Sequence, residues 1–285
     1  MSTLACGKRS GRLVLVAPHA AVVPFCFGNV IVDPERAASL LAQVQLFRAA
    51  QYRADGAIPP EQLSADGRHV QSGDSLGWHV IALASSGEVQ AAVRCIIRQA
   101  PVPFDELGIA HAAIASCAHW GSAVRTAMNH LIASAASRGE RFAEIGGWAV
   151  APHRRRTPLA LRMAFTVWAL SRRLGGQSGI ATATRRHQSA AILRKLGCRS
   201  LRAGEHEIPK YFDPAYGCEM ELLHFDGVHS SARINEMSQE ISDDLLGLPV
   251  YRTFSRQLQG LHREPACHGG VLGCLNESFV ASVLP

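Results

Sequence analysis

Charged residues, aromatic residues and low-complexity segments are all scarce in this sequence. Charged side chains make up 18% and aromatic side chains 6% of the 285 residues, whereas hydrophobic residues make up 47%. The mean hydropathy of +0.05 agrees with this balance. The composition excludes an intrinsically disordered chain, a coiled coil and a collagen-like repeat. A chain of this length can bury a substantial core, either as one large domain or as two small ones.

Long uninterrupted apolar runs are also missing. Residues 13–32 follow a basic stretch and resemble a signal peptide or membrane segment, but Pro18 and Pro24 divide them. Each proline removes a helical N–H and clashes with the preceding turn, so we expect two short strands, at 13–17 and 28–32. No other segment approaches the roughly 18 apolar residues of a membrane helix. We therefore expect a cytoplasmic protein without an integral membrane segment.

No C-x-x-C pair occurs among the eight cysteines. A chain of this size needs no disulfide staples, so we interpret the cysteines as reduced thiols of a cytoplasmic protein. Cys267, His268 and Cys274 lie close together in the sequence, but their spacing matches no standard zinc site and no fourth ligand is evident. We therefore expect no metal.

The excess of basic over acidic residues is small. The 29 lysines and arginines exceed the 23 aspartates and glutamates by 6, and the pI is about 9.1. This charge suits an acidic partner, but it is too weak to indicate nucleic acid. We therefore expect no nucleic-acid partner.

Helix and strand patterns alternate along the chain. Thr157, Pro158 and Gly175 bound the best-defined helix as its cap, its first residue and its stop. The other helices are expected at 34–52, in a segment ending at Arg138-Gly139, at 186–196 and in a polar stretch near 230–246. Strands are expected at 78–84, 88–98, 142–150, 178–184 and 218–225.

This order of elements predicts an α/β fold with a mixed sheet and helices on both faces. The predicted domain organisation has three parts. Residues 1–33 form an N-terminal extension that contributes the extra strands, residues 34–247 form the main domain, and residues 248–285 form a C-terminal tail of unknown role.

Three consecutive arginines stand between the strand at 142–150 and the helix that starts at Thr157. Arg154, Arg155 and Arg156 place guanidinium groups beside the free N–H groups and the positive end of a helix. This combination is typical of a phosphate site. The alternative is a solvated basic loop without a ligand.

The segment from Glu144 to Ala160, together with 181–198, resembles motifs A and B of the GNAT superfamily of acyltransferases. It is most similar to the branch of acyl-homoserine-lactone synthases, N-acyl amino acid synthases and exosortase-associated acyltransferases, whose strand reads roughly E-x-S-R-F-x-V. Glu144, Trp148 and Val150 match this pattern, whereas glycines replace its serine and arginine. The resemblance covers about 40–225 and implies a GNAT-like fold.

The resemblance implies an acyl-phosphopantetheine donor. The superfamily's pyrophosphate loop, R/Q-x-x-G-x-G/A, aligns with residues 155–160, where Pro158 replaces a glycine and has no N–H to donate. The missing contact favours acyl carrier protein over coenzyme A, although both remain open. The residues expected at the phosphopantetheine are Arg154, Arg155, Arg156, Thr157, Pro158 and Ala160.

The resemblance also implies roles in catalysis. Glu144 is the expected base for the attacking amine, and its alternative role is a structural ion pair with Arg94 or Arg141. Arg94 is expected to bind a substrate carboxylate, or else to form a structural ion pair. Tyr211 and Tyr216 are further candidates for an acid that protonates the leaving thiolate. The backbone around Trp148, Ala149 and Val150 is expected to bind the oxyanion, with Trp148 lining the acyl chain or belonging to the core.

The function expected from these features is N-acyl transfer. The enzyme would move a fatty acyl group from acyl carrier protein or coenzyme A to a small amine such as an amino acid. One alternative is an acetyl-coenzyme-A-dependent N-acetyltransferase. A second is a non-catalytic GNAT-like binding or regulatory domain.

Overall fold

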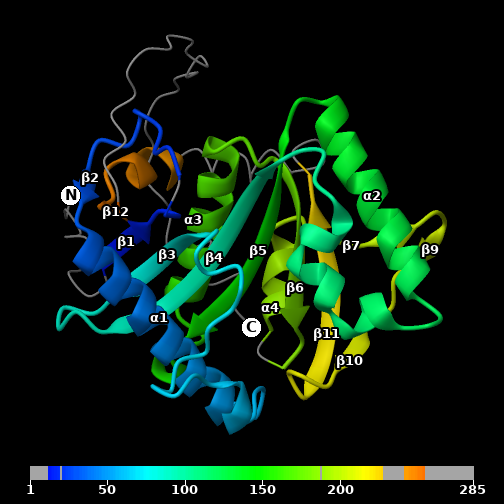
Figure 1. The fold of residues 1–285 in the computed structure, drawn as a ribbon, viewed down its shortest axis with the longest axis horizontal. Helices are drawn as coiled ribbons and strands as arrows, with labels where there is room; N and C mark the ends of the chain where they lie inside the picture. Colours follow the sequence, from blue (N-terminus) through cyan, green and yellow to red (C-terminus); the bar gives the residue numbers. More distant parts are fainter. Residues whose placement is uncertain (1–11, 20, 187, 227–240, 254–285) are drawn as a thin grey trace, which may run out of the picture.

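The structure, a computed structural model, describes residues 12–19, 21–186, 188–226 and 241–253. Its main feature is a ten-stranded sheet, shown in Figure 1, with the order β10-β11-β6-β5-β4-β3-β1-β12-β2 and with β7 paired to β11. The strands of this sheet are β1 (Arg12–Val16), β2 (Val30–Val32), β3 (Trp78–Leu83), β4 (Val89–Gln99), β5 (Arg141–Val150), β6 (Ser178–Thr184), β7 (Arg199–Ser200), β10 (Tyr211–Asp213), β11 (Cys218–Phe225) and β12 (Val250–Arg252). A separate small hairpin consists of β8 (Arg202–Ala203) and β9 (His206–Glu207).

Parallel and antiparallel pairing occur in the same sheet. β5 pairs parallel with β6, and β12 pairs parallel with both β1 and β2. The pairs β1–β3, β3–β4, β4–β5, β6–β11 and β10–β11 are antiparallel. The predicted mixed α/β fold is therefore confirmed.

Helices cover both faces of the sheet (Figure 1). α1 and α2 pack on one face, and α3 and α4 pack on the other. Successive β5 side chains alternate between the two layers, so Phe142 belongs to the core under α2 and Ala143 to the core under α3. These helices are α1 (Pro34–Ala54), α2 (Gly121–Ser137), α3 (Pro158–Arg173) and α4 (Ser189–Lys195).

The helix boundaries follow local capping chemistry. Thr157 caps α3 as predicted, because its Oγ1 accepts the N–H of Leu159 at 3.3 Å, and Pro158 follows at the first helical position. Gly175, directly after this helix, has a φ of +85°, which suits its predicted role as the stop. The predicted helix at 186–196 is shorter, because Gln188 has a left-handed φ of +63° and α4 begins only at Ser189.

Segments at both ends of the described chain extend the sheet. β1 lies beside β3, and β12 lies between β1 and β2, so the predicted N-terminal extension and the residues after Gly247 both contribute strands. The three-part domain organisation remains a prediction. Of the polar helix expected near 230–246, residues 241–246 are helical and 227–240 lie outside the described residues.

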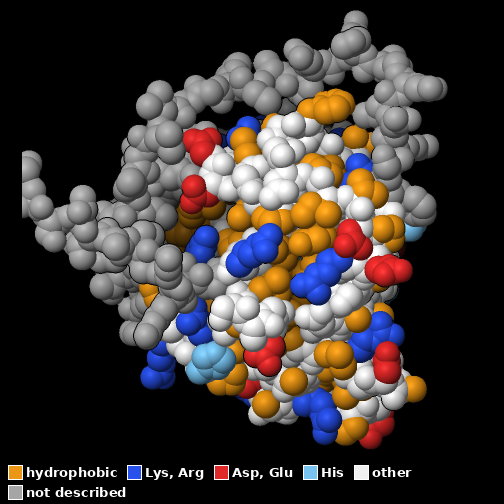
Figure 2. Space-filling view, turned by 90° about the vertical axis from the view of Figure 1, so that its left-hand side faces the viewer, with side chains coloured by type: hydrophobic (Ala, Val, Ile, Leu, Met, Phe, Trp, Pro, Cys, Tyr) orange, Lys and Arg blue, Asp and Glu red, His pale blue; other side chains and the backbone are white. Residues whose placement is uncertain are grey.

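The side of the molecule that bears the β2 edge is shown in Figure 2. Basic, acidic and apolar side chains are interspersed over the part of this face that the structure describes. Within the described ranges, no helix has both the length and the apolar character needed to cross a membrane.

Candidate active site

β5 and β6 separate near the middle of the sheet. Their parallel pairing runs from Phe142 opposite Ser178 to Ile145 opposite Ala181 and is not continued along β5. On the other side of β5, the register with β4 shifts between Ala92 and Arg94, which marks a bulge. Beyond Ile145, β5 has no strand partner among the described residues on its β6 side, and side chains bond the carbonyls of Trp148 and Val150 there.

Gly147 lies at this bulge and has a φ of +63°, a conformation that favours glycine. A Cβ atom at this position would also come within 3.2 Å of Nη1 of Arg48. Gly147 is one of the two glycines that depart from the family pattern. The local backbone and the guanidinium of Arg48 both favour a glycine at this position.

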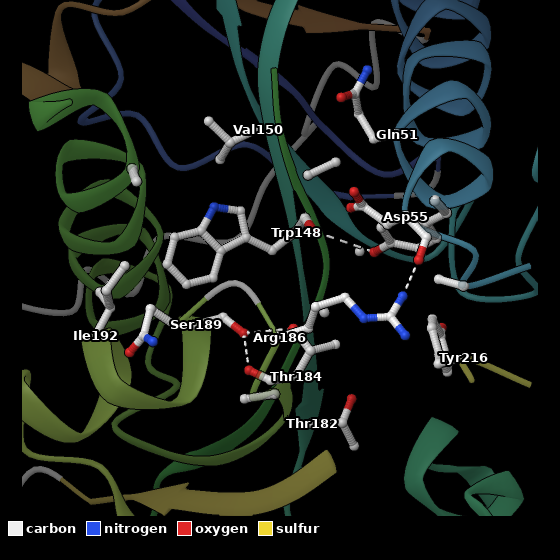
Figure 3. Close-up of a pocket in the computed structure, with 18 of the residues that line it drawn as sticks. Gln51, Asp55, Trp148, Val150, Thr182, Thr184, Arg186, Ser189, Ile192 and Tyr216 are labelled. Atoms are coloured by element: carbon white, nitrogen blue, oxygen red, sulfur yellow. Dashed lines mark hydrogen bonds between the residues drawn. The ribbon is translucent and has the colours of Figure 1, made fainter. Parts of the chain in front are cut away.

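A cavity of about 840 Å³ occupies the gap between the separated strands. Its size is within the usual range for small-molecule sites. The lining residues come from both faces of the sheet, because α1 contributes on one side and α3 and α4 contribute on the other (Figure 3). The cavity therefore passes through the sheet, and two ligands can approach each other from opposite faces.

The α1 side is backed by a buried charged cluster. Asp74 accepts hydrogen bonds from Arg48 at 2.6 and 3.0 Å and from Arg94 at 2.7 Å. Side-chain exposure is 0% for Arg48 and 3% for Asp74, so water does not screen this pair. Burial alone would raise the pKa of Asp74, but the two guanidinium groups outweigh it and hold that pKa well below its usual range. The cluster consists of two positive groups and one negative group.

Two tyrosines connect this cluster to the cavity. Gln71 accepts a hydrogen bond from Arg94 at 3.0 Å and donates one to the hydroxyl of Tyr216 at 3.2 Å. The hydroxyl of Tyr52 donates to the carbonyl oxygen of Trp148 at 3.3 Å. Burial raises the pKa of both tyrosines, so both hydroxyls are protonated at neutral pH. The α1 side of the cavity thus presents neutral hydroxyl groups in front of a buried positive charge.

The opposite side, toward α3 and α4, is mostly apolar. Ala160, Ile192 and Leu193 line it together with Ile145 of β5. Figure 3 shows the indole of Trp148 extending from β5 toward Ile192, on the side of the strand opposite Asp55 and Tyr216. This side suits a hydrocarbon chain.

Arg155 is held at the rim of the cavity by Asp55, the residue that caps the end of α1. Its two terminal nitrogens donate to the Asp55 carboxylate at 3.0 and 3.2 Å, and its Nε donates to the carbonyl of Val150 at 3.2 Å. Arg186, in the turn after β6, donates to the backbone carbonyls of Asp55 and Gly217. Through Arg155, the basic loop that was expected to bind phosphate is therefore bonded to the C-terminal end of α1.

Glu144 lies next to the cavity but is not among its lining residues. Its carboxylate accepts the N–H of Gly108 at 3.0 Å and that of Ile109 at 2.9 Å, with Arg98 at 3.5 Å. A Cβ at position 108 would come within 2.9 Å of the carboxylate, so a larger residue there would displace the Glu144 side chain. The alternative role expected for Glu144, an ion pair with Arg94 or Arg141, is wrong in its partner. Glu144 is instead bonded by these two amides and lies beside Arg98. Its role as a base remains a prediction.

The structure brings about half of the expected site residues to the cavity. Those that line it are Trp148, Ala149, Val150, Arg155, Arg156 and Ala160. Those outside its lining are Glu144, Arg94, Arg154, Thr157 and Pro158. Of the two candidate acids, Tyr216 lines the cavity, whereas Tyr211 packs against the core under α2.

Four residues of this region were missed by the sequence interpretation: Arg48, Tyr52, Asp55 and Asp74. Arg48 and Tyr52 lie on α1, and Asp55 is its C-cap. Their spacing of three or four residues places all three on one side of the helix. That periodicity was the available signal. Asp74 gave none, because it lies in a polar segment that resembles an ordinary loop.

Metal ligation has no evident place in this region. Among the residues that the structure describes, no group of three His, Cys, Asp or Glu side chains could hold a metal ion. Cys267, His268 and Cys274 lie outside those residues.

No protein-family model and no curated protein matches this sequence. Among solved structures, the chain is similar to BjaI, a CoA-dependent acyl-homoserine lactone synthase solved with SAM and isopentyl-CoA. The identity is 16%, the match covers 86% of this chain and 95% of that one, and the TM-score is 0.50. MesI, another CoA-dependent acyl-homoserine lactone synthase, has 14% identity, coverage of 81% and 95%, and a TM-score of 0.50. FeeM, an N-acyl amino acid synthase from uncultured soil microbes, has 11% identity, coverage of 80% and 99%, and a TM-score of 0.44.

The first two similarities concern the fold, because the sequence identities are low. They extend over most of this chain and nearly all of the two matched chains. The GNAT-like fold expected from the sequence is therefore confirmed: this chain has the fold of the acyl-homoserine lactone synthases.

Proposed function

We propose that this protein is an N-acyltransferase of the GNAT type. The observation that carries the proposal is the cavity that passes through the sheet where β5 and β6 separate, with an apolar side under α3 and α4 and a polar side under α1. The acyl chain of a thioester donor is apolar and an amine acceptor is polar, so each suits one side of the cavity. The fold shared with BjaI and MesI, both named as acyl-homoserine lactone synthases, supports the same reaction class.

The donor is an acyl-phosphopantetheine thioester carried by acyl carrier protein or by coenzyme A. Arg156 at the cavity and the N-terminus of α3 supply positive charge for its phosphate. Arg155 would also bind that phosphate after releasing its ion pair with Asp55. Because BjaI and MesI are CoA-dependent, coenzyme A thioesters are the first donors to test, while Pro158 and the net charge of +6 favour acyl carrier protein.

The acceptor is a small amine with a carboxylate, such as an amino acid. Arg48, Arg94 and Asp74 leave one positive charge uncompensated among themselves behind the α1 side of the cavity. A carboxylate that reaches Gln71 or Arg94 would balance that charge. This attraction supports the predicted role of Arg94 in substrate binding.

The reaction would proceed by attack of the neutral amine nitrogen on the thioester carbonyl carbon. A C–N bond forms, the C–S bond breaks, the amine loses a proton and the thiolate leaves. Backbone N–H groups of β5 near Trp148 to Val150 stabilise the oxyanion. Glu144 would take the amine proton through water, and the protonated hydroxyl of Tyr216 would give a proton to the thiolate.

The test is to measure both products of transfer. Purified protein is incubated with medium-chain and acetyl thioesters of coenzyme A and of acyl carrier protein, together with a mixture of amino acids and simple amines. Thiol release is followed with a thiol reagent, and N-acyl products are identified by mass spectrometry. Lipid extracts of cells that express the protein identify the natural product.

Each outcome selects one function. An N-acylated amino acid formed in step with thiol release supports the proposal, and turnover of acetyl-coenzyme A alone supports an ordinary N-acetyltransferase. Donor binding without thiol release supports a non-catalytic binding domain. Weaker capture of acyl carrier protein at higher salt identifies the carrier-bound donor, since exposed charges are screened beyond about 8–10 Å.

A further inference from the structure

Asp55 is the only acidic residue among the described residues that line the cavity. It is the C-cap of α1, where the partial negative charge of the helix end disfavours a carboxylate. Two arginines offset this charge: Arg155 binds the carboxylate through two nitrogens at 3.0 and 3.2 Å, and Arg186 donates to the backbone carbonyl of Asp55 (Figure 3). Residues that break a local rule in this way are expected at functional sites.

Both members of the Arg155–Asp55 pair can be reached by a ligand. Both line the cavity, and their side chains are 26% and 16% exposed. An ion pair that stays in contact with water contributes little to stability. A charged ligand can therefore replace either partner at little cost.

The pair lies beside the β5 residues at which the oxyanion is expected. Nε of Arg155 donates to the carbonyl of Val150 at 3.2 Å. Tyr52, about one turn before Asp55 on α1, donates to the carbonyl of Trp148 at 3.3 Å. One guanidinium group thus separates the carboxylate of Asp55 from the backbone of β5. An amine that took the place of this guanidinium would lie next to that backbone.

We infer that Asp55 binds the amine of the acceptor, and that the donor makes Asp55 accessible by drawing Arg155 onto its phosphate. The inference deepens the proposed function and rests on it, because the two ligands are those of the proposed N-acyl transfer. Ion pairs are conserved in the exchange. Arg155 leaves the carboxylate for the phosphate, and N–H groups of the acceptor amine replace the guanidinium on the carboxylate.

This exchange makes donor and acceptor binding cooperative. Before the donor binds, Arg155 occupies the place of the amine. When the donor binds alone, its phosphate draws the positive charge away from Asp55, and the amine restores it. Such coupling is reciprocal, so the factor by which the donor strengthens acceptor binding equals the factor by which the acceptor strengthens donor binding.

The test measures alanine binding by calorimetry, with and without a coenzyme A thioether that cannot transfer its acyl chain. Ethylamine and propionate, which lack the carboxylate and the amine of alanine, are measured in the same way. Asp55→Asn removes the charge and nearly preserves the shape. With the thioether present, this variant should bind alanine and ethylamine about 10- to 100-fold more weakly and propionate equally well. It should bind the thioether at least as tightly as the wild type, because Arg155 then has no carboxylate to leave.

Arg155→Gln tests the other partner, with effects of opposite sign. It should bind the thioether more weakly, and it should bind alanine without the thioether, because the guanidinium no longer covers Asp55. A loss of folding would weaken the binding of both ligands in both variants, and melting curves identify it.

Glu140→Gln is the matched control for these two variants. The pair of Glu140 with Arg138 also has two hydrogen bonds, at 2.7 and 3.0 Å, and its side chains have similar exposure, 11% and 32%. It lies just before the start of β5. This variant should leave the affinities for alanine and for the thioether unchanged.

The outcomes separate this inference from the proposed function. Equal alanine affinity of the wild type and Asp55→Asn overturns the inference, and continued thiol release and N-acylation would leave the proposed function intact. Alanine binding to the wild type that is the same with and without the thioether, or absent in both cases, also overturns it. A wild-type protein that neither binds nor consumes any thioester overturns the proposed function and the inference together.

Discussion

The two sides of the cavity are built in different ways. On the α1 side, Arg48, Asp74 and Arg94 form a buried charged cluster whose members are separated by 20 or more residues in the sequence. On the α3 and α4 side, neighbouring apolar residues such as Ile192 and Leu193 form an ordinary hydrophobic wall. This difference supports the proposed division of the cavity between a charged acceptor on one side and an acyl chain on the other.

The largest effect on activity is expected at Glu144, which lies on the same face of β5 as the charged cluster. Glu144→Gln removes the predicted base, and loss of a general base lowers the rate by on the order of 10²–10⁴-fold. The measurement is kcat for the folded variant. Glu140→Gln is the control, because Glu140 is also a hydrogen-bonded carboxylate but lies just before the start of β5, where Arg138 and Ser178 donate to it.

Unchanged turnover in the Glu144→Gln variant would change the role assigned to Glu144 on the polar side of the cavity. If the Glu144→Gln variant keeps its turnover but melts at a lower temperature, the carboxylate serves only to anchor the amides of Gly108 and Ile109. The base would then have to come from another group on the polar side.

The next largest effect is expected from Asp74→Asn. This change leaves the buried guanidinium of Arg48 and the partly buried one of Arg94 without their carboxylate. Removing one partner of a buried ion pair costs about 3–5 kcal/mol of unfolding free energy. Urea denaturation measures the loss. The exposed pair of Asp66 and Arg68 supplies the control, and Asp66→Asn should leave the midpoint unchanged. Equal midpoints for the two variants would mean that the cluster does not stabilise the polar side.

A pH dependence is expected from His79, which is buried behind the same cluster. Its Nε2 lies 2.8 Å from the carbonyl oxygen of Asp74, so that nitrogen carries the proton and Nδ1 is unprotonated. Burial lowers the pKa of His79 to about 4 from the ordinary value of 6.5. Between those values the unfolded chain binds more protons, so stability is complete above pH 6.5 and falls as the pH decreases toward 4.

The expected loss from His79 is about 3 kcal/mol across that interval. His69 acts in the same direction, because burial also lowers its pKa to about 4. Urea denaturation at several pH values measures the slope, and His79→Gln should make it about half as steep. A slope that is the same in the variant would show that His79 does not titrate in the expected way.

The smallest effect is expected from Pro158→Gly, at the start of α3. If coenzyme A is the donor, the restored N–H improves its binding by about 0.5–1.5 kcal/mol. If the donor is carrier-bound, the change lowers stability by about 0.4–1 kcal/mol with little gain in affinity. Melting temperature and donor KM are measured together, and tighter coenzyme A binding at unchanged stability would argue against the carrier protein.

The apolar side was largely predictable from the sequence, because its signals are local. Thr157 and Pro158 marked the start of α3, and the strands that flank the cavity followed from their composition. The polar side was not predictable in the same way. Asp74 is buried only because it meets Arg48 and Arg94 in three dimensions, and a sequence pattern carries no sign of such a meeting.

The same limit applies to individual site residues. Arg155 was expected in a basic loop that binds phosphate, and it lines the cavity, but its partner Asp55 lies 100 positions away in the sequence. Glu144 was placed on the strand that lines the cavity, but the amides that hold it come from a loop whose conformation no local pattern specified. The helices and strands were therefore easier to predict than the hydrogen-bond partners that lie far apart in the sequence.

In the proposed reaction, donor and acceptor meet through the sheet from opposite faces. Hydrogen–deuterium exchange tests it most directly, with the protein alone, with a non-transferable acyl thioether, and with thioether and acceptor together. We expect the thioether to protect backbone amides at 146–150, 156–160 and 181–184, and the acceptor to add protection around Gln71 and Tyr216. Protection by both ligands on a single face, or at segments away from the cavity, would contradict it.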